Sequence, residues 1–391
     1  MKDNVKLGTL GDIFIGLTYR PDDVSNEGTV VLRSSNIQNG RLDFADTVRV
    51  KCKVRENLIV KPNDILMCSR NGSAKLVGKC TLLPKLDEEM TFGAFMTIIR
   101  TQHNPYLLHF FNSNAFRNQL GSAATTTINQ ITRKMLDDIV VPIYAKAQED
   151  YIVSVFNQID ALIYLRQQQL EQLDELVKSR FTEMFGDPMT NPMGWDKVNI
   201  STVVGGKVSN GFFAKRDDYC DDGNVEVLGV ANIVNRMYSN IENLPQTNGT
   251  DTDIEKYVVK YGDMLFCRSS LVAAGIGKAS IVPRGTPNNV LFECHVIRLP
   301  LDLNKCVPEF MQVLSTTDYF RNQVIAQSKT ATMTTIGQDG ILKTDIILPP
   351  LELQKQFLEF VEQTEKSKLA VQQSIAELEE LKKSLMQQYF G

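Results

Sequence analysis

The tetrapeptide FRNQ occurs twice, at Phe116–Gln119 and at Phe320–Gln323. The first copy closes the segment PYLLHFFNSNAFRNQ, which begins at Pro105, and the second closes PEFMQVLSTTDYFRNQ, which begins at Pro308. Apolar residues in the first segment can share one face of a helix, because they recur at three- and four-residue spacing. We therefore expect a helix over residues 105–120, with the phenylalanine of FRNQ facing inward and its polar residues outward.

The match extends far beyond the tetrapeptide in both directions. Upstream, VKPNDILMCSRNGSAKLVGK from Val60 corresponds to VKYGDMLFCRSSLVAAGIGK from Val259. Downstream, LEQLDELVKSRFTEMFG from Leu170 corresponds to IAELEELKKSLMQQYFG from Ile375. Ordered self-similarity of this kind indicates repeated structural units, and here one unit of about half the chain is written twice.

Length and composition indicate the class of protein. The 391 residues are 43% hydrophobic, which is typical of a soluble globular protein with two or three domains. No apolar run reaches the ~18 residues of a membrane helix, and the first residues lack the apolar block of a signal peptide. We expect a cytoplasmic protein without membrane contact. Seven scattered cysteines without a CxxC pair and only three histidines predict reduced, mostly buried thiols and no metal site.

Charge is distributed unevenly along the chain. The net charge is -4, yet residues 1–145 carry 18 Lys and Arg against 14 Asp and Glu. Residues 146–190 carry 4 against 8, residues 191–350 carry 15 against 17, and residues 351–391 carry 5 against 7. A polyanion would therefore be held by local basic patches or with the help of a partner.

Two long helices are the clearest local signal. Neither segment contains glycine or proline before its closing FG, and apolar residues recur in both at nearly the 3.5-residue spacing of a coiled coil. The expected seams are Ile159, Leu162, Leu170, Leu173, Leu176, Val177 and Met184 in the first helix, and Val371, Ile375, Leu378, Leu381 and Leu385 in the second. We expect the two helices to pair antiparallel as a rod of roughly 50 Å.

The rest of each repeat reads as a globular domain. Short β-branched runs such as TVVLRSSNI and VEVLGVANI alternate with turn signals and short helices, which predicts a mixed α/β (α+β) fold with an internal pseudo-two-fold repeat. The expected organisation is a first domain at 1–145, a long helix at 146–186, a hinge at 187–195, a second domain at 196–350 and a second long helix at 351–391.

No catalytic pattern is complete. The sequence NPY at Asn104 lacks one proline of the Asn-Pro-Pro-Tyr/Phe loop of adenine methyltransferases, and GGKVS at Gly205 is only a fragment of a phosphate-binding loop. The histidines lie among apolar neighbours or in a turn, where a structural role is more common. We expect a non-catalytic protein without a cofactor.

Nucleic-acid recognition needs short polar side chains for base edges, with Arg and Lys for phosphate and guanine. Polar segments follow the paired strands and FRNQ in each half, although ordinary solvated loops or helix caps could look the same. The candidate DNA-binding residues of the first half are Arg33, Ser34, Asn36, Ser69, Arg70, Asn71, Lys75, Thr125, Thr126, Thr127, Asn129 and Gln130. Those of the second half are Asn232, Arg268, Ser269, Ser270, Lys278, Lys329, Thr330, Thr332, Thr334 and Thr335.

The ordered duplication resembles one known family. GDPMTNPMGW after the first long helix, the run FRNQ…TTTINQITRKML with its echo FRNQ…TATMTTIGQDGIL, and the VKPNDIL and VKYGDML pair are similar to the specificity (S) subunits of type I restriction-modification systems. The resemblance implies two target recognition domains that each read one half of a split double-stranded DNA sequence. It also implies a helical spacer that docks two methyltransferase (M) subunits, with restriction/translocase (R) subunits outside.

Two other function classes remain open from the sequence. A self-contained DNA methyltransferase with fused recognition domains would bind S-adenosylmethionine, and a coiled-coil scaffold for protein partners would show no sequence-dependent DNA retention. The incomplete methyltransferase and cofactor loops count against the first alternative.

Overall fold

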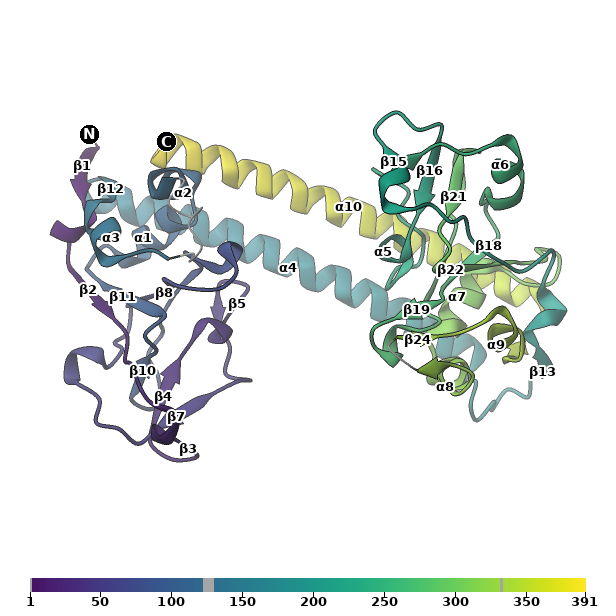
Figure 1. Cartoon of the computed structure of the whole chain (residues 1–391), viewed down its shortest axis with the longest axis horizontal. Helices are drawn as coiled ribbons and strands as arrows, with labels where there is room; N and C mark the ends of the chain where they lie inside the picture. Colours follow the sequence, from purple (N-terminus) through teal and green to yellow (C-terminus); the bar gives the residue numbers. More distant parts are fainter. Residues whose placement is uncertain (1, 122–129, 331–332) are drawn as a thin grey trace. The chain divides into compact units, whose positions relative to one another are not determined.

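The computed structural model describes residues 2–121, 130–330 and 333–391. By its internal contacts the chain divides into two compact units, which are described separately. Unit 1 comprises Met1–Gln168 and Gln372–Gly391, and unit 2 comprises Gln169–Val371. Both boundaries fall inside the long helices, so each unit contains a globular part and a portion of both helices (Figure 1). The predicted mixed α/β fold is confirmed.

Two four-stranded sheets form the globular part of unit 1. The first has the order β10-β4-β7-β3, with its strands at Met90–Phe92, Thr29–Leu32, Val48–Val50 and Val24–Ser25. The second has the order β2-β11-β8-β9, with its strands at Asp12–Ile15, Met96–Arg100, Ile65–Cys68 and Cys80–Leu82. A two-stranded sheet pairs β1 (Asp3–Lys6) with β12 (Val140–Ile143), and β5 (Ile37–Gln38) pairs with β6 (Arg41–Leu42). Helices α1 (Asn104–Phe111), α2 (Asn114–Leu120) and α3 (Arg133–Asp138) complete this part.

Unit 2 repeats this order of elements. Its sheet β14-β22-β18-β20 has strands at Ser209–Asn210, Val296–Pro300, Asp263–Cys267 and Ala279–Ile281. Its sheet β15-β17-β16-β21 has strands at Tyr219–Cys220, Gln246–Thr247, Val225–Leu228 and Val290–Phe292. Strand β13 (Asp196–Asn199) pairs with β25 (Asp345–Leu348). The helices are α5 (Val230–Ile233), α6 (Asp251–Tyr257), α7 (Pro308–Thr316), α8 (Asp318–Ala326) and α9 (Gln338–Leu342).

Helices α4 (Lys146–Phe185) and α10 (Leu351–Phe390) are each 40 residues long. In unit 1 the Asp160 carboxylate pairs with Lys382, and in unit 2 Asp174 Oδ1 lies 2.8 Å from Lys368 Nζ. Higher numbers in α4 thus meet lower numbers in α10, so the predicted antiparallel pairing is confirmed within each unit. Three expected seam residues are instead exposed: Leu162 at 47%, Leu176 at 47% and Leu381 at 49%. A straight helix drifts away from a strict 3.5-residue repeat, so these positions turn away from the partner helix.

The last turn of each long helix closes a hydrophobic core. In unit 1 the Phe390 ring lies 5.4 Å from the Tyr106 ring and 5.9 Å from the Phe156 ring, and Tyr144 donates a hydrogen bond to the Tyr389 carbonyl at 2.8 Å. In unit 2 the Phe185 ring lies 4.9 Å from the ring of Phe310. Each core therefore combines residues of both repeats, because the helix end that closes it belongs to the other repeat.

The segment after α4 is a closed turn. Gly186 ends the helix at a φ of +74°, where an added Cβ would meet Pro192 Cγ at 2.7 Å. The indole of Trp195 donates to the Phe185 carbonyl at 2.8 Å, and the Asn191 amide donates to the Trp195 carbonyl at 2.8 Å. These bonds fasten the turn to the end of the helix.

The expected helix over residues 105–120 is wrong in one respect, because the structure has two helices there. Ser113 accepts a hydrogen bond from the Phe116 amide and begins α2 as its N-cap, and Thr317 does the same for Phe320 in unit 2. Both phenylalanines are buried, as expected. In this way a polar residue inside an apolar periodic pattern divides the helix.

The glutamine of FRNQ has the same role in both units. Gln119 Oε1 accepts from the Val140 amide at 2.7 Å, and its Nε2 donates to the Val140 carbonyl at 2.8 Å. Gln323 makes the matching pair with Asp345, at 2.9 Å and 3.0 Å. A glutamine side chain thus satisfies both backbone groups of one strand residue, which fixes the helix to the strand that precedes the long helix.

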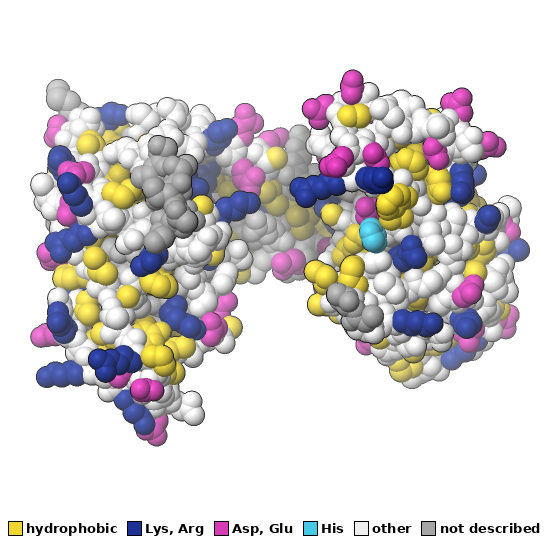
Figure 2. All heavy atoms as spheres, viewed as in Figure 1, with side chains coloured by type: hydrophobic (Ala, Val, Ile, Leu, Met, Phe, Trp, Pro, Cys, Tyr) yellow, Lys and Arg dark blue, Asp and Glu magenta, His cyan; other side chains and the backbone are white. Residues whose placement is uncertain are grey.

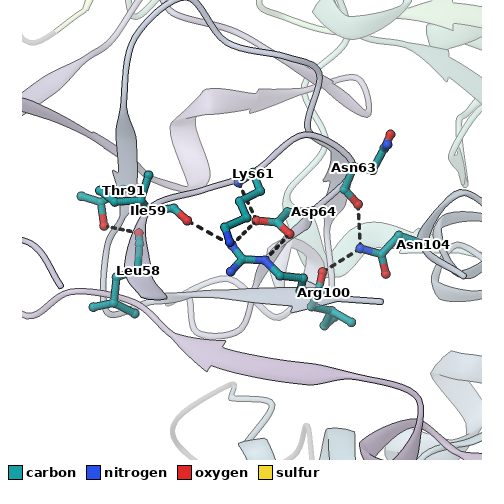
Figure 3. A network of polar contacts seen from close by, with 9 residues as sticks. Leu58, Ile59, Lys61, Asn63, Asp64, Thr91, Arg100 and Asn104 are labelled. Carbon is teal, nitrogen blue, oxygen red and sulfur yellow. Dashed lines mark hydrogen bonds and ion pairs between the residues drawn. The ribbon is translucent and has the colours of Figure 1, made fainter. Parts of the chain in front are cut away.

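The aspartate of the VKPNDIL and VKYGDML segments also has a structural role. Asp64 is 1% exposed, and it accepts hydrogen bonds from the Lys61 amide at 2.7 Å and from the Arg100 guanidinium at 2.8 Å and 2.6 Å (Figure 3). Asp263 accepts from the Lys260 amide at 3.0 Å, and burial raises the pKa of its carboxyl. Both carboxylates close the turn that leads into the central buried strand.

No helix in the described ranges combines the length and apolar character needed to cross a membrane.

Candidate nucleic-acid interface

Two polar segments that are distant in the sequence form one small sheet in unit 2. Strand β19 (Ser269–Ser270) follows the buried β18 and pairs with β24 (Thr334–Thr335), which pairs in turn with β23 (Lys329–Thr330). Ser269 lies opposite Thr335, and Ser270 lies opposite Thr334. Thr332 lies outside the described residues. The polar loop after the paired cysteine and the Thr-rich run therefore present a single surface.

Unit 1 brings together the same two segments. Arg70 and Gln130 form an isolated antiparallel bridge, and the Ile131 amide donates to the Ser69 carbonyl at 2.7 Å. The predicted residues Thr125, Thr126, Thr127 and Asn129 lie outside the described residues.

A residue from the neighbouring strand turn lies beside each surface. In unit 1 the amides of Ser69 and Arg70 donate to the Phe95 carbonyl at 2.9 Å and 3.1 Å. In unit 2 the Arg268 amide donates to the His295 carbonyl at 2.9 Å. Phe95 and His295 thus occupy equivalent positions. An aromatic ring beside polar and cationic side chains provides a stacking surface for a base.

These two rings make different contacts. Phe95 is 58% exposed, and the Arg70 guanidinium lies over its ring at 5.3 Å from the centroid. His295 Nδ1 lies 3.2 Å from Ser269 Oγ. Arg268 also donates from Nη1 to the Cys294 carbonyl at 3.0 Å, so its guanidinium is held against the same turn. The equivalent positions therefore offer different chemistry in the two units.

Arg33 and Ser34 extend the surface of unit 1. With Phe95 they line a pocket of about 590 Å³, where the Asn71 amide donates to Ser34 Oγ at 3.4 Å. Arg33 Nη2 lies 2.8 Å from Asp46 Oδ2. Lys75 lies in an exposed turn of the same loop. Four of the predicted residues, from two separate segments, are thereby neighbours: Arg33, Ser34, Arg70 and Asn71.

Other predicted residues shape the loops. Asn36 is completely buried and its amide donates to the carbonyls of Asp43 and Asp46 at 2.9 Å and 2.8 Å. Asn232 accepts from the Gly229 amide at 3.0 Å, and Thr334 is 3% exposed. Lys278 donates to Asn235 Oδ1 at 2.8 Å, in the turn after α5.

Exposed apolar residues near these loops were missed by reasoning that considered only polar side chains. Leu271 is 83% and Val272 64% exposed in the loop after β19, and Phe213 is 68% exposed after β14. Figure 2 shows cationic and apolar side chains interspersed on the viewed face of each unit. The available signal was an aliphatic pair, Leu271–Val272, in a loop otherwise made of small and polar residues.

The cysteines beside the site favour a role in binding over one in catalysis. The thiols of Cys68 and Cys267 donate to the carbonyls of Arg70 and Ser269, and burial raises the pKa of both thiols. Raised pKa values keep the thiols protonated and poorly nucleophilic. Among the described residues no group of three or more His, Cys, Asp or Glu could hold a metal ion.

Comparison with known proteins gives consistent matches. Residues 192–380 match the family described as "Type I restriction modification DNA specificity domain". The chain is 27% identical over 385 residues to the type I restriction enzyme StySPI specificity subunit of Salmonella potsdam, covering 91% of this chain and 80% of that protein. It is 25% identical over 389 residues to the EcoKI specificity subunit of Escherichia coli K12, with the same coverage.

Solved structures share the fold. A chain from a type I R-M system, studied for its complex assembly and conformational transition, has a TM-score of 0.57 at 15% identity and covers 100% of this chain and 97% of its own. The type I S subunit from M. genitalium has a TM-score of 0.53 at 10% identity, with 100% and 96% coverage. The resemblance expected from the duplicated motifs is confirmed: along most of its length the chain is similar to the specificity subunits of type I restriction-modification systems.

Proposed function

We propose that each unit reads one half of a bipartite DNA target, and that the chain selects the sequence on which partner subunits act. The observation that carries this proposal is the repeated surface: the loop after the paired cysteine meets the run after FRNQ in unit 1 and again in unit 2. A duplicated binding surface with different side chains, such as Phe95 and His295, suits two half-sites of different sequence.

The exposed side chains fit the demands of DNA recognition. Lys329 and Thr335 are exposed on the small sheet of unit 2, where they can reach phosphates, while Arg268 and Ser269 can reach base edges. In unit 1, Arg70, Asn71 and Lys75 occupy the matching loop. Asn36, Asn232 and Thr334 support these loops in our proposal, and the remaining candidate residues supply the contacts.

The long helices have the spacer role in this proposal. Residues 1–145 and 196–350 are assigned as target recognition domains, 146–186 and 351–391 as spacer helices, and 187–195 as the connection between the halves. The spacer docks two methyltransferase subunits, and restriction/translocase subunits join the complex. We infer a non-catalytic chain that works in the cytoplasm, since the thiols of Cys68 and Cys267 at the site are poorly nucleophilic and its relatives are named specificity subunits.

The first test is methylation sequencing of DNA from cells that carry the methyltransferase with this chain, with Arg70→Ala, or with Arg268→Ala. We expect Arg70→Ala to relax specificity in one half-site only and Arg268→Ala in the other, because each arginine belongs to a different unit. Loss of a base contact should cost about 1–3 kcal/mol of discrimination at the affected position.

Two controls define the result. Cells without this chain should lose methylation at the split motif while the methyltransferase is still present. Lys305→Ala removes a lysine that pairs with Asp302 at 3.2 Å in the turn before α7, and it should leave both half-sites unchanged. If the Arg70→Ala and Arg268→Ala variants gave the same methylation pattern as the wild type, both arginines would be removed from the proposed interface.

A further inference from the structure

Unit 2 contains a pocket of about 370 Å³ whose lining shares only Lys278 with the proposed DNA-reading surface. Its walls are the second half of α4, the first half of α10, the corner between α7 and α8, and the turns that follow α5 and precede β20. An apolar floor is formed by Val177, Met237, Ala279 and Val313.

Three cationic side chains converge on this pocket from the globular part. Arg236, Lys278 and Arg321 line it, and none of the three is paired with a carboxylate among the described residues. The Lys278 ammonium donates to Asn235 Oδ1 at 2.8 Å, and Arg321 Nη2 donates to the Ala274 carbonyl at 3.0 Å. Both groups therefore retain further donors.

Of the three cations, Arg321 gives the strongest evidence for a bound anion. Its Nη1 atom is buried and has no hydrogen-bond partner within the described part of the chain. Burial lowers the pKa of this guanidinium, which means that the fold holds a charge whose hydration is reduced. A buried charged donor without an acceptor costs free energy unless an anion supplies one.

The frame around the cations is fixed. The buried Gln312 side chain donates to the carbonyls of Arg236 and Ala279 at 3.1 Å and 3.3 Å, which ties the two turns together. Asn235 adopts a φ of +59°, and an added Cβ on Gly277 would lie 3.5 Å from Arg321 Nη1. The turns that carry Arg236 and Lys278 are thus held together before any ligand arrives.

The two carboxylates of the pocket are already engaged. Asp174 and Glu365 both accept from Lys368 Nζ at 2.8 Å on the helical wall. Lys178, the other cation of that wall, lies 2.7 Å from Glu175. The carboxylates are therefore held by cations of the helices, and the cations of the globular part remain available to an external anion.

We propose that this pocket binds a phosphate group through Arg236, Lys278 and Arg321. Planar guanidinium groups match phosphate geometry, and a lysine adds a compact charge. The phosphate belongs either to the DNA backbone, in which case the inference rests on the proposed function, or to a free phosphate compound. Phosphate is the shared chemistry, and the experiment distinguishes the two sources.

The equivalent place in unit 1 lacks the complete set. In the alignment of the repeats Arg321 corresponds to Arg117, whereas Arg236 corresponds to Gly40. The groove beside α1 and α2 in unit 1 is lined by Asp160, Glu379 and Glu380 together with Lys382 and Lys383. The proposed phosphate site therefore belongs to unit 2 alone, and Arg117→Gln is a matched control.

The test uses the full chain in two arms. In the first, thermal unfolding is measured in inorganic phosphate and in sodium chloride of equal ionic strength, for the wild type, Arg236→Gln, Arg321→Gln and Arg117→Gln. In the second, DNA affinity of the chain with its methyltransferase partner is measured against salt concentration. Arg236→Gln is the principal variant, since Arg321 packs against the fold and its replacement affects stability as well.

Phosphate should raise the Tm of the wild type and of Arg117→Gln above the chloride value, and this rise should be lost in Arg236→Gln and Arg321→Gln. A DNA phosphate in the pocket should also reduce the slope of log affinity against log salt by about 1 in Arg236→Gln. A lost Tm rise with an unchanged slope assigns the pocket to a free phosphate compound. A reduced slope without a phosphate-dependent Tm rise assigns it to DNA alone.

The proposal is overturned when Arg236→Gln matches the wild type in two measurements: the rise of Tm in phosphate over chloride, and the slope of log DNA affinity against log salt. The first arm contains no DNA, so its outcome is independent of the proposed function. A wild-type complex that retains no DNA sequence-specifically would instead refute the proposed function.

Discussion

At the scale of single residues, the repeat preserves side chains that satisfy backbone groups. Gln119 and Gln323 each bind both polar groups of one strand residue, and Asp64 and Asp263 each close a turn before a buried strand. The bond partners lie some twenty residues away in the case of the glutamines. Such contacts explain why FRNQ recurs: in both copies its phenylalanine is buried and its glutamine binds a strand.

His109 provides a residue-scale prediction about pH. It is buried in α1, its ring stacks on Phe156 at 5.0 Å, and burial lowers its pKa to about 4. Its unfolded pKa is about 6.5, so the unfolded chain binds the proton more readily, and stability is lost as pH falls from the unfolded toward the folded value. At pH 5 this loss should reach about 2 kcal/mol in unit 1.

The measurement is hydrogen exchange of unit 1 amides at pH 7 and pH 5, in the wild type and in His109→Phe. Phenylalanine keeps the stacking and removes the titration, so the variant should lose less stability on acidification. Effects of the carboxyl groups are common to both proteins and cancel in the comparison. An equal loss in the two proteins would show that His109 does not contribute to acid sensitivity.

Residue roles in the site could be predicted only partly from the sequence. The pattern located the loop of Arg70 and the loop of Arg268, since each follows a recognisable buried strand. It could not tell that Asn36 supports the loop whereas Ser34 lines the surface. Only the fold shows that Asn36 is buried against the carbonyls of Asp43 and Asp46. Phe95 was missed because it follows the Gly93–Ala94 turn of an apolar strand pair and looks like core.

At the scale of elements, the long helices are partly core and partly solvent-exposed. Phe181 of α4 is 2% exposed and packs against Phe310 and Phe357 of unit 2 at 5.5 Å and 5.7 Å between ring centroids. Leu176, which lies five residues earlier in the same helix, is 47% exposed. Periodicity predicted the helices, and the domain that folds back between them predicted their antiparallel pairing. Neither could show which apolar positions the globular parts cover.

Phe181→Ala and Leu176→Ala should therefore differ strongly in their effect on unit 2. Removing the buried ring leaves a cavity and should cost about 3–5 kcal/mol, whereas the exposed leucine should cost well under 1 kcal/mol. Chemical denaturation followed by the fluorescence of Trp195, which lies in unit 2, measures the difference. Comparable destabilisation by the two variants would contradict the burial described for α4.

At the scale of the whole molecule, helix length is the variable that the proposed function links to DNA. The boundaries of the two units lie between Gln168 and Gln169 of α4 and between Val371 and Gln372 of α10. Seven residues inserted at both places should therefore leave the contacts within each unit unchanged. A heptad adds about 10 Å of helix, which corresponds to about three base pairs. We expect methylation sequencing to reveal the same half-sites with a longer spacer.

The control is an insertion in α4 alone. It places the two helices out of register and should reduce methylation rather than change the spacer. A matched double insertion that methylates the original motif, with its original spacer, would exclude the helices as the determinant of half-site spacing.

The position of Phe390 has a consequence for synthesis of the protein. The side chain is 4% exposed in the core of unit 1, beside the rings of Tyr106, Phe110 and Phe156. The amino-terminal unit leaves the ribosome first, yet its core lacks Phe390 until the last turn of α10 has been translated. At elongation rates of about 5–20 residues per second this delay is roughly 10–40 s, during which apolar surface of the nascent first unit is open to chaperones.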